Sequence, residues 1–234
     1  MKRVTKLATN SHVSVVIVDD HPMVREHLAL ALEAEPRLRV VGFADSRTTA
    51  LEIIERLRPQ LAIVDLSLRE SHGLDLIKDV SRLHPDVRVL VLSMHEEAVY
   101  AQRSLEAGAR GYITKQEATE KILSAVRKVL DGEVYLSPDM AHELAAGMSH
   151  SKRGTGSPVS GLSDRELQVF EMIGRGLSMG QIAAQVNLSL KTVETYRDRL
   201  KTKLQLQTPN DLRQAAIQWV SRGDLKPLRK PKDS

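Results

Sequence analysis

The sequence predicts an α/β chain in which five βα units form a doubly wound parallel sheet and a small all-α domain follows. Short apolar runs recur between residues 13 and 114, and stretches with helical spacing separate them. Such an alternation is typical of a parallel sheet with helices on both faces and right-handed crossovers. After residue 160 only helical patterns remain, which predicts the second domain.

Each element follows from this pattern in chain order. The expected strands cover 13–18, 39–44, 61–65, 87–92 and 110–114, and the helices that follow them cover 23–34, 46–57, 73–83, 96–107 and 117–131. A short helix is expected from about Pro138, and the Ser/Gly-rich stretch 149–158 is expected to be a flexible linker. Four further helices are expected near 164–174, 178–186, 189–204 and 208–221, because Ser163, Ser178, Ser189 and Thr208 are favourable N-caps.

These patterns divide the chain into a first domain at 12–131, a linker with a short helix at 132–160, a second domain at 161–222 and a disordered tail at 223–234. Cysteine is absent from the sequence, which excludes disulfides and thiolate metal sites and fits a reducing compartment. No apolar run approaches the roughly 18 residues of a membrane span, and none of signal-peptide length follows the basic start. We therefore expect a cytoplasmic protein without membrane association.

Charge is distributed unevenly between the two parts. Residues 1–131 hold 19 basic and 19 acidic side chains, whereas residues 132–234 hold 15 and 11. The whole net charge of +4 therefore lies in the second part, which indicates a polyanionic partner there.

Three carboxylates follow strands that the pattern predicts to be buried. Asp19 and Asp20 close the run 13–18, and Asp65 follows the run 61–64. Because functional sites of open parallel sheets form outside the carboxyl ends of the strands, these acids are expected to converge. Converging carboxylates repel one another unless a cation lies among them, and Mg²⁺ prefers such oxygen ligands.

Two further strand ends supply what phosphoryl transfer to a carboxylate needs. A carboxylate can attack phosphorus and form an aspartyl phosphate, and the reaction requires a metal, a fixed cation and a small hydroxyl donor. Lys115 follows the fifth strand and Ser93 follows the fourth, so the cation and the hydroxyl are both present. The alternative is that these are scattered polar residues at loop mouths, as in any α/β domain.

With Tyr112 placed three residues before Lys115, the order and spacing of these residues resemble the receiver domain of bacterial response regulators, over about residues 12–131. The resemblance implies a flavodoxin-like fold in which Asp65 accepts phosphate from a sensor histidine kinase. It also implies that the main-chain carbonyl of Ser67 completes the Mg²⁺ site, and that Ser93 and Tyr112 move inward when phosphate arrives. Gln116 replaces a proline that many receivers have, so a cis bond is not expected there.

Other readings of this region are weaker. The turn at residues 19–22 lacks the glycines that let a backbone approach a pyrophosphate, and no Walker-type loop is present. A phosphatase with a nucleophilic aspartate is closer in chemistry, but such an enzyme places its nucleophile at the first strand. His21, His72 and His95 lie near the same loops and are expected to be ordinary loop histidines, although His95 could influence water access to the phosphate.

The second domain contains a helix-turn-helix pattern at 178–186, Asn187-Leu188 and 189–204. On a helical wheel, Val193, Tyr196, Leu200 and Leu204 face inward. Polar side chains occupy the opposite side, and basic side chains flank them on both edges, as a helix in a major groove requires. The expected DNA contacts are Lys191, Thr192, Glu194, Thr195, Arg197, Asp198, Arg199 and Lys201.

The segments 162–166, 176–178, 182–183 and 191–196 resemble a LuxR-type DNA-binding domain, over about residues 160–222. Together with a receiver, this domain is typical of response regulators of the NarL/FixJ type, and the resemblance implies that Glu194, Thr195 and Asp198 face the bases. Glu194 and Asp198 can accept a hydrogen bond from cytosine N4. Alternatively, they form ion pairs with Arg197 or Lys201 and touch no base.

These observations predict a phosphorylation-switched transcription factor that binds double-stranded DNA as a homodimer. It is not expected to be an enzyme beyond self-phosphorylation and slow self-dephosphorylation. One hypothesis is that the unphosphorylated first domain covers helix 189–204. The alternative function is a phosphorylation-independent DNA binder whose first domain is an interaction module. Trp219 is expected in the core or at a dimer contact.

Overall fold

The computed structural model describes residues 12–68, 73–94, 98–117, 119–151 and 158–222. Its five strands form one parallel sheet in the order β2-β1-β3-β4-β5, which confirms the predicted flavodoxin-like sheet. The strands are β1 (Val13–Val18), β2 (Leu38–Ala44), β3 (Leu61–Val64), β4 (Arg88–Ser93) and β5 (Gly111–Thr114).

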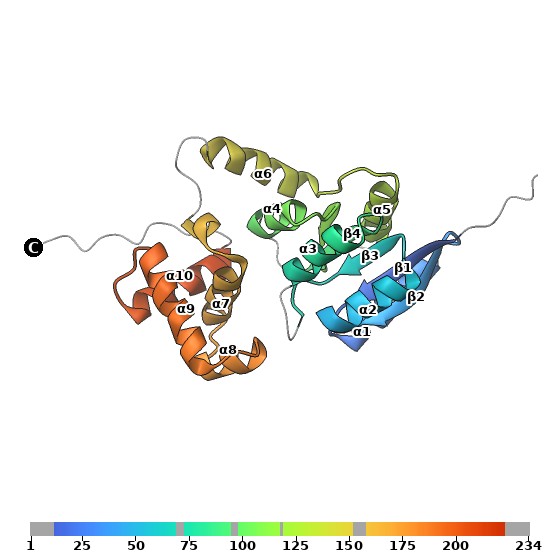
Figure 1. The fold of residues 1–234 in the computed structure, drawn as a ribbon. Helices are drawn as coiled ribbons and strands as arrows, with labels where there is room; N and C mark the ends of the chain where they lie inside the picture. The colour runs from blue at the N-terminus through green and yellow to red at the C-terminus, as the bar shows by residue number, and fades with distance from the viewer. Residues whose placement is uncertain (1–11, 69–72, 95–97, 118, 152–157, 223–234) are drawn as a thin grey trace, which may run out of the picture.

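Helices cover both faces of this sheet (Figure 1). One face packs against α1 (Pro22–Glu33) and α5 (Thr119–Leu130), and the other against α2 (Arg47–Leu57), α3 (Gly73–Leu83) and α4 (Ala98–Glu106). All four residues of β3 are buried, because helices lie on both sides of this central strand. That burial explains why its sequence is a continuous apolar run.

After α5 the chain returns to the sheet. Tyr135 forms a bridge with Gly111, donating its N–H to the Arg110 oxygen at 3.0 Å and accepting from the Tyr112 N–H at 2.9 Å. Next, α6 (Pro138–Ser151) begins at the predicted proline and packs beside α4. It extends to residue 151, longer than the short helix expected, and most of the predicted linker, at 152–157, lies outside the described residues.

The second domain consists of η1 (Pro158–Gly161), α7 (Asp164–Gly174), α8 (Met179–Gln185), α9 (Leu190–Lys203) and α10 (Pro209–Arg222). These helices confirm the four that the sequence predicts. Ser163 and Ser178 each form a capping box, and the Ser189 hydroxyl accepts the Thr192 N–H at 3.1 Å. Asn187, between α8 and α9, has a φ of 52°, the left-handed conformation that asparagine tolerates in a tight turn.

We call residues 12–131 the sheet domain and residues 158–222 the helical domain. The two domains pack together through α4 on one side and α7 and α10 on the other. Tyr100 of α4 lies 6.1 Å from Trp219 of α10 between ring centroids, and Trp219 lies 5.7 Å from Phe170 of α7. One cluster of buried apolar side chains therefore runs from the face of the sheet that carries α2, α3 and α4 into the helical domain.

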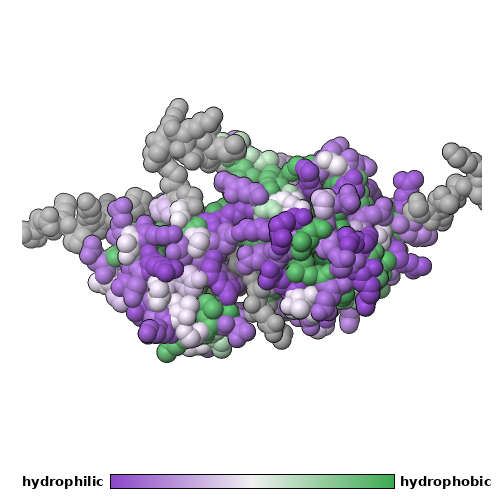
Figure 2. All heavy atoms as spheres, viewed as in Figure 1, coloured by the Kyte–Doolittle hydropathy of each residue, from purple (hydrophilic) through white to green (hydrophobic). Residues whose placement is uncertain are grey.

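Hydrophilic side chains dominate the visible surface of both domains, and hydrophobic ones gather there in small patches (Figure 2). Among the described residues, none of the helices combines the length and apolar character that a membrane span requires.

Candidate functional site

Three aspartates meet at the carboxyl edge of the sheet. Asp19 and Asp20 follow β1, and Asp65 follows the neighbouring strand β3. The backbone N–H of Asp65 donates to the oxygen of Val18 at 2.8 Å, which fixes the two strand ends side by side. All three aspartates are buried, with at most 8% of each residue exposed.

Lys115 joins two of these carboxylates. Its Nζ lies 2.5 Å from Asp19 Oδ2 and 2.8 Å from Asp65 Oδ2. The lysine follows β5, and its backbone N–H donates to the oxygen of Ser93 at 2.7 Å, so the end of β4 holds it in place. One cation therefore connects two acids that are far away in the sequence. Asp19 precedes Lys115 by 96 positions and Asp65 precedes it by 50.

Burial and charge act in opposite directions on these groups. Burial raises the pKa of Asp65. The positive charge of Lys115 lowers this pKa and the negative charge of Asp19 raises it, and the net shift is upward. Burial lowers the pKa of Lys115, but the charge of Asp65 and the contacts with Asp19 raise it by more. The lysine therefore stays protonated, and the site retains an excess of negative charge.

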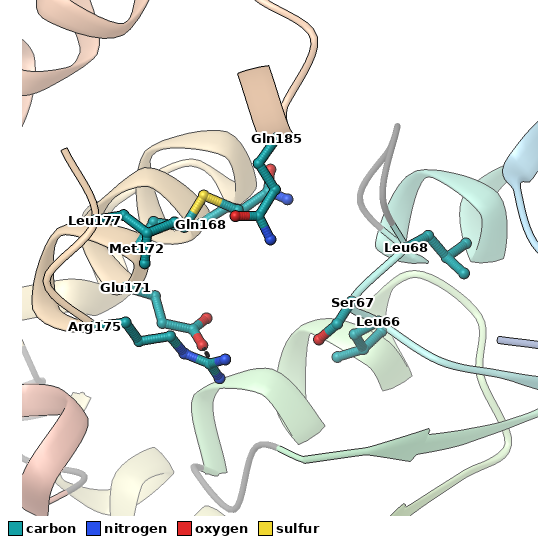
Figure 3. A pocket seen from close by; sticks show the side chains of 9 residues that line it. All are labelled: Leu66, Ser67, Leu68, Gln168, Glu171, Met172, Arg175, Leu177 and Gln185. Atoms are coloured by element: carbon teal, nitrogen blue, oxygen red, sulfur yellow. Dashed lines mark ion pairs between the residues drawn. The ribbon is translucent and has the colours of Figure 1, made fainter. Parts of the chain in front are cut away.

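The acidic site has the donor set of a divalent cation. One ligand atom from each of Asp19, Asp20, His21 and Asp65 lies within 4.8 Å of the others. Within the described residues, Asp65 Oδ1 is buried without a hydrogen-bond partner. A hard cation such as Mg²⁺ would satisfy that oxygen and balance the excess charge. Ser67, whose main-chain carbonyl is the further predicted ligand, lies two residues beyond Asp65 and borders a cavity next to α7 (Figure 3). The three aspartates and this carbonyl are oxygen ligands, as Mg²⁺ prefers, so they fit the predicted metal.

His21 is more than the ordinary loop histidine that we expected. Its Nδ1 lies 2.7 Å from Asp20 Oδ1 and 3.3 Å from Asp19 Oδ1, and its backbone N–H donates to Asp19 Oδ1 at 2.8 Å. Its side chain is 61% exposed, so it contacts the acids from the solvent side. His72 and His95 lie outside the described residues.

Ser93 and Tyr112 lie on the neighbouring strands β4 and β5, and both are fully buried. Tyr112 belongs to the apolar cluster on the face of the sheet that carries α2, α3 and α4. The resemblance implies that this tyrosine moves inward on phosphorylation. In the structure it is already buried, so any change that phosphate brings at Tyr112 is not a move from an exposed to a buried position.

The second group of predicted site residues lies on α9. Val193 and Leu200 are buried, as the helical wheel predicts, while the side chains on the opposite side reach solvent. A groove of about 290 Å³ runs along that side. Its lining consists of Ser189, Lys191, Thr192, Thr195, Tyr196 and Arg199, four of which are predicted DNA contacts.

The charged side chains of α9 form different ion pairs. Asp198 lies 3.2 Å from Lys201 Nζ and 3.5 Å from Arg197 Nε, the ion pairs that the second of our two interpretations requires. Glu194 forms no ion pair within the part of the chain that the structure describes. Lys203, on the edge of the predicted groove face, instead pairs with Glu166 at 2.7 Å inside the helical domain.

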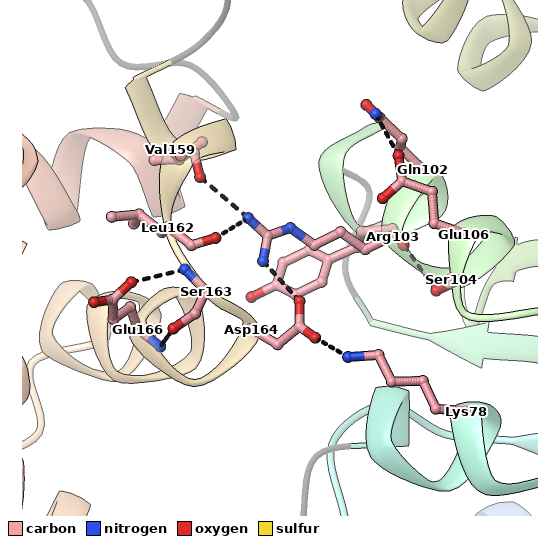
Figure 4. Close-up of polar contacts among 12 residues, drawn as sticks. Lys78, Gln102, Arg103, Ser104, Glu106, Val159, Leu162, Ser163, Asp164 and Glu166 are labelled. Atoms are coloured by element: carbon pink, nitrogen blue, oxygen red, sulfur yellow. Dashed lines mark hydrogen bonds and ion pairs between the residues drawn. The ribbon is translucent and has the colours of Figure 1, made fainter.

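The hypothesis that the sheet domain covers helix 189–204 does not match the structure. Lys191, Thr195, Asp198 and Arg199 are exposed, whereas the sheet domain contacts α7, α10 and the segment before α7. No pattern in the sequence indicates these contacts, because Arg103 and Tyr100 occupy ordinary positions of an amphipathic helix. Asp164 belongs to the predicted N-cap signature of α7, and that signature does not indicate that it also accepts a hydrogen bond from Arg103 (Figure 4).

Comparisons with known proteins identify a family for each of the two domains. Residues 15–127 match the family described as response regulator receiver domain, and residues 160–217 match the one described as bacterial regulatory proteins, luxR family. The chain is 33% identical over 205 residues to the response regulator UvrY of Escherichia coli K12, covering 88% of this chain and 94% of that protein. It is 34% identical to the response regulator GacA of Pseudomonas aeruginosa over 88% of this chain and 95% of that protein.

A solved structure also resembles most of the chain. RcsB from Salmonella enterica serovar Typhimurium, bound to the promoter rprA in the presence of the phosphomimetic BeF3⁻, has a TM-score of 0.62 and 25% sequence identity. The match covers 87% of this chain and 98% of that one. The similarity thus includes both domains.

Proposed function

Because the chain belongs to the response regulators of the NarL/FixJ type, we propose that Asp65 is its phosphoacceptor and that a sensor histidine kinase supplies the phosphoryl group. The protein is a DNA-binding response regulator of a two-component system that controls transcription. What remains to be assigned is which of its residues carry out each step.

The observation that carries this proposal is the unequal environment of the two Asp65 oxygens. Lys115 holds Oδ2 at 2.8 Å, and Oδ1 has no hydrogen-bond partner among the described residues. Oδ1 would bind the metal, so the attacking oxygen is Oδ2, which Lys115 orients and releases when it turns to the phosphoryl group. Asp19 shares the same lysine, which keeps the site assembled before any substrate arrives.

In the transfer, an Asp65 oxygen attacks phosphorus, the bond from phosphorus to the kinase histidine nitrogen breaks, and an acyl phosphate forms. The histidine nitrogen keeps the bonding electron pair. Mg²⁺ held by Asp19, Asp20, Asp65 and the Ser67 carbonyl would supply positive charge to the phosphoryl oxygens. Lys115 is placed to donate to another phosphoryl oxygen, and the Ser93 hydroxyl to a third.

We expect self-phosphorylation by small phosphodonors and slow loss of the phosphate, without turnover of an external substrate. The switch residues in this proposal are Ser93 on β4 and Tyr112 on β5. These two strands are neighbours, and Tyr112 belongs to the apolar cluster that also contains residues of α4.

The output site in this proposal is the exposed side of α9, which would bind double-stranded DNA in the major groove. Lys191, Arg197, Arg199 and Lys201 are proposed phosphate contacts, and Thr192, Glu194, Thr195 and Asp198 are proposed to face the bases. One helix reads only a few base pairs, so we propose that the phosphorylated protein binds two half-sites as a homodimer. Family membership also supports action in the cytoplasm.

The proposal is tested by incubating the protein with acetyl phosphate and Mg²⁺ and following mass and DNA binding in the same samples. We expect one added phosphoryl group and tighter DNA binding, both absent from Asp65→Asn. Asp75→Asn, which changes an exposed aspartate on α3, is the matched control and should behave as wild type. Unimpaired labelling of Asp65→Asn would overturn the assignment.

A phosphorylation-independent DNA binder is the second candidate, favoured by the exposure of the predicted base-facing side of α9. It predicts that the Asp65→Asn protein binds DNA and regulates transcription in cells as wild type does. Three buried carboxylates, two of them paired with one lysine, have no purpose in that case, so we rank this candidate second.

A further inference from the structure

A polar cleft lies at the edge of the sheet opposite the acidic site. Arg88 is the first residue of β4 and Arg110 directly precedes β5, so both stand at the amino ends of strands whose carboxyl ends lead to Ser93 and Lys115. The cleft has a volume of about 430 Å³ and is lined by Ser81, Pro85, Asp86, Val87, Arg88, Gly108, Arg110 and Gly132. It is therefore separate from the proposed phosphorylation site.

The two arginines of the cleft have fixed backbones and free side chains. The Arg110 N–H donates to the oxygen of Val89 at 2.7 Å, and the Arg88 N–H donates to the oxygen of Gln60 at 3.1 Å. Within the described residues, neither guanidinium has an ion pair or a hydrogen-bond partner. Because a guanidinium carries five N–H donors, two unpaired ones in a single cleft favour an anionic ligand.

Two glycines in the left-handed conformation form part of the walls. Gly108 has a φ of 110° and Gly132 a φ of 88°, and their N–H groups donate to the oxygens of Leu105 and Val129 at 3.0 and 3.1 Å. The ends of α4 and α5 are thus capped, and carbonyl groups that would repel an anion are already bonded. A Cβ at Gly108 would lie 2.3 Å from the hydroxyl oxygen of Ser81, so glycine leaves room for that hydroxyl.

The cavity beside Ser67 differs from this cleft (Figure 3). It has a volume of about 130 Å³, and its arginine, Arg175, already pairs with Glu171 at 2.5 Å. The cleft at the opposite edge is larger, and both of its arginines are available. Its volume falls within the roughly 300–1,000 Å³ of small-molecule sites, so it accommodates more than an inorganic anion.

Asp86 narrows the choice of ligand. It is the single acid among the lining residues, it is exposed, and it forms no ion pair in the part of the chain that the structure describes. Asp86 repels a simple anion, but it can accept a hydrogen bond from a hydroxyl group next to the anionic group of a ligand. A phosphate monoester of a sugar has both groups, and arginine binds phosphate through two parallel hydrogen bonds.

We propose that this cleft binds a small sugar phosphate. In the proposal, Arg88 and Arg110 hold the phosphate, the Ser81 hydroxyl donates to it, and Asp86 accepts from a sugar hydroxyl. A ligand held in this way would join the starts of β4 and β5. The inference goes beyond the proposed function and does not require phosphorylation of Asp65.

Amide NMR of the full ¹⁵N-labelled chain tests the proposal, because the backbones of Gly108 and Gly132 lie at the cleft. In a buffer without phosphate, ribose 5-phosphate should shift both glycine amides in a saturable titration. Inorganic phosphate should bind about tenfold more weakly, since it lacks the hydroxyl that Asp86 would accept. Ribose without phosphate should leave both amides unchanged.

Variants connect these shifts to the named side chains. Arg88→Ala and Arg110→Ala should each weaken ribose 5-phosphate binding by at least about tenfold, the usual loss for a charged hydrogen bond. Asp86→Ala should abolish the preference for ribose 5-phosphate over inorganic phosphate. Arg39→Ala, at an exposed arginine of β2 outside the cleft, is the matched control and should bind as wild type.

Circular dichroism and thermal melting verify that each variant is folded, and the exposed Arg110 carries the test if Arg88→Ala does not fold. Glycine amides that no probe shifts would overturn the inference, and so would equal binding of sulfate, inorganic phosphate and ribose 5-phosphate. Shifts confined to α9 would place the phosphate at the proposed DNA-binding surface and would also overturn it. Asp65→Asn should bind ribose 5-phosphate normally, so failure of phosphoryl uptake would overturn only the proposed function.

Discussion

At the acidic site, Asp19, Asp20 and Asp65 are at most 8% exposed, whereas along α9 the side chains of Lys191 and Arg199 extend into solvent. The acidic site is assembled from the ends of three strands, and its charges interact at distances below 3 Å. The α9 surface belongs to one helix, and its ion pairs are open to water. The proposed phosphorylation site is thus buried, whereas the proposed DNA-binding surface is exposed.

This difference has a physical reason. Phosphoryl transfer requires groups that are fixed before the reaction and charges that water does not screen, so the site must be buried. DNA supplies its own dense charge, and the protein contributes cations that exchange with counterions, so the surface must be open. The consequence is that substitutions at the acidic site should have large, specific effects, and those on α9 graded and salt-dependent ones.

The largest effect is expected at Lys115. Lys115→Ala removes the one cation within 3 Å of Asp65 among the described residues, so the rate of phosphoryl uptake should fall by about 100-fold. Labelling with acetyl phosphate, read by mass spectrometry, measures this rate. Lys121→Ala, which removes an exposed lysine paired with Glu117, is the control and should label normally. Equal rates for the two variants would show that Lys115 takes no part in phosphoryl uptake.

On α9, effects of about five- to tenfold are expected, and they should depend on salt. Arg199→Ala should weaken binding to all DNA sequences alike and reduce the slope of log affinity against log salt by about 1. Binding isotherms at several salt concentrations give this slope. Arg213→Ala, an exposed arginine on α10, should leave it unchanged. A loss confined to one DNA sequence would instead identify Arg199 as a base reader.

Asp198 decides between the two interpretations of the α9 acids. If it only pairs with Arg197 and Lys201, Asp198→Asn should release two cations and strengthen binding to all sequences by about two- to fivefold. If it accepts a hydrogen bond from cytosine N4, the same change should relax discrimination at one base pair. Affinities for a set of singly substituted DNA sites distinguish the two outcomes.

The sequence was sufficient for the sheet, the helices and the positions of the acids, because buried parallel strands have continuous apolar runs with polar residues only at their ends. It could not predict the contact between Arg103 and Asp164. These residues are 61 positions apart on helix surfaces, and only the packing of Tyr100 against Trp219 brings those surfaces together. The contacts of His21 with two acids depend on the turn after β1, which periodicity does not describe.

Effects on stability should be smaller and should have opposite signs at two aspartates, the buried Asp65 and the half-buried Asp164. The pKa of Asp65 is raised, so ionisation of this group disfavours the folded state; Asp65→Asn should stabilise the metal-free protein by about 1 kcal/mol at neutral pH. The difference should vanish as the pH falls through the folded pKa toward 3.8, where wild-type Asp65 is itself protonated.

Asp164 is the matched opposite case: burial raises its pKa, but the hydrogen bonds from Lys78 and Arg103 lower it by more. Asp164→Asn should destabilise the protein at neutral pH, and that loss should shrink as the pH falls below 3.8 and through the folded pKa. Denaturant titrations with chelator, at several pH values, measure both differences. The same sign for both variants would contradict the assignment of charge at the two sites.

The smallest difference between the two domains is expected at two helix starts that have the same local structure. Ser46 caps α2 in the sheet domain and Ser189 caps α9, and each hydroxyl accepts the N–H of a threonine three residues later, at 3.3 and 3.1 Å. Ser46→Ala and Ser189→Ala should each cost about 1 kcal/mol, because a cap acts within one helical turn and does not depend on the burial of distant groups.

Thermal melts followed by circular dichroism measure these costs, with Ser46→Gly and Ser189→Gly as controls that should lose only a few tenths of a kcal/mol. If Ser189→Ala costs several times more than Ser46→Ala, then the start of α9 is stabilised by more than its cap. The contrast between a site that depends on tertiary packing and a surface that depends on one helix would then need revision.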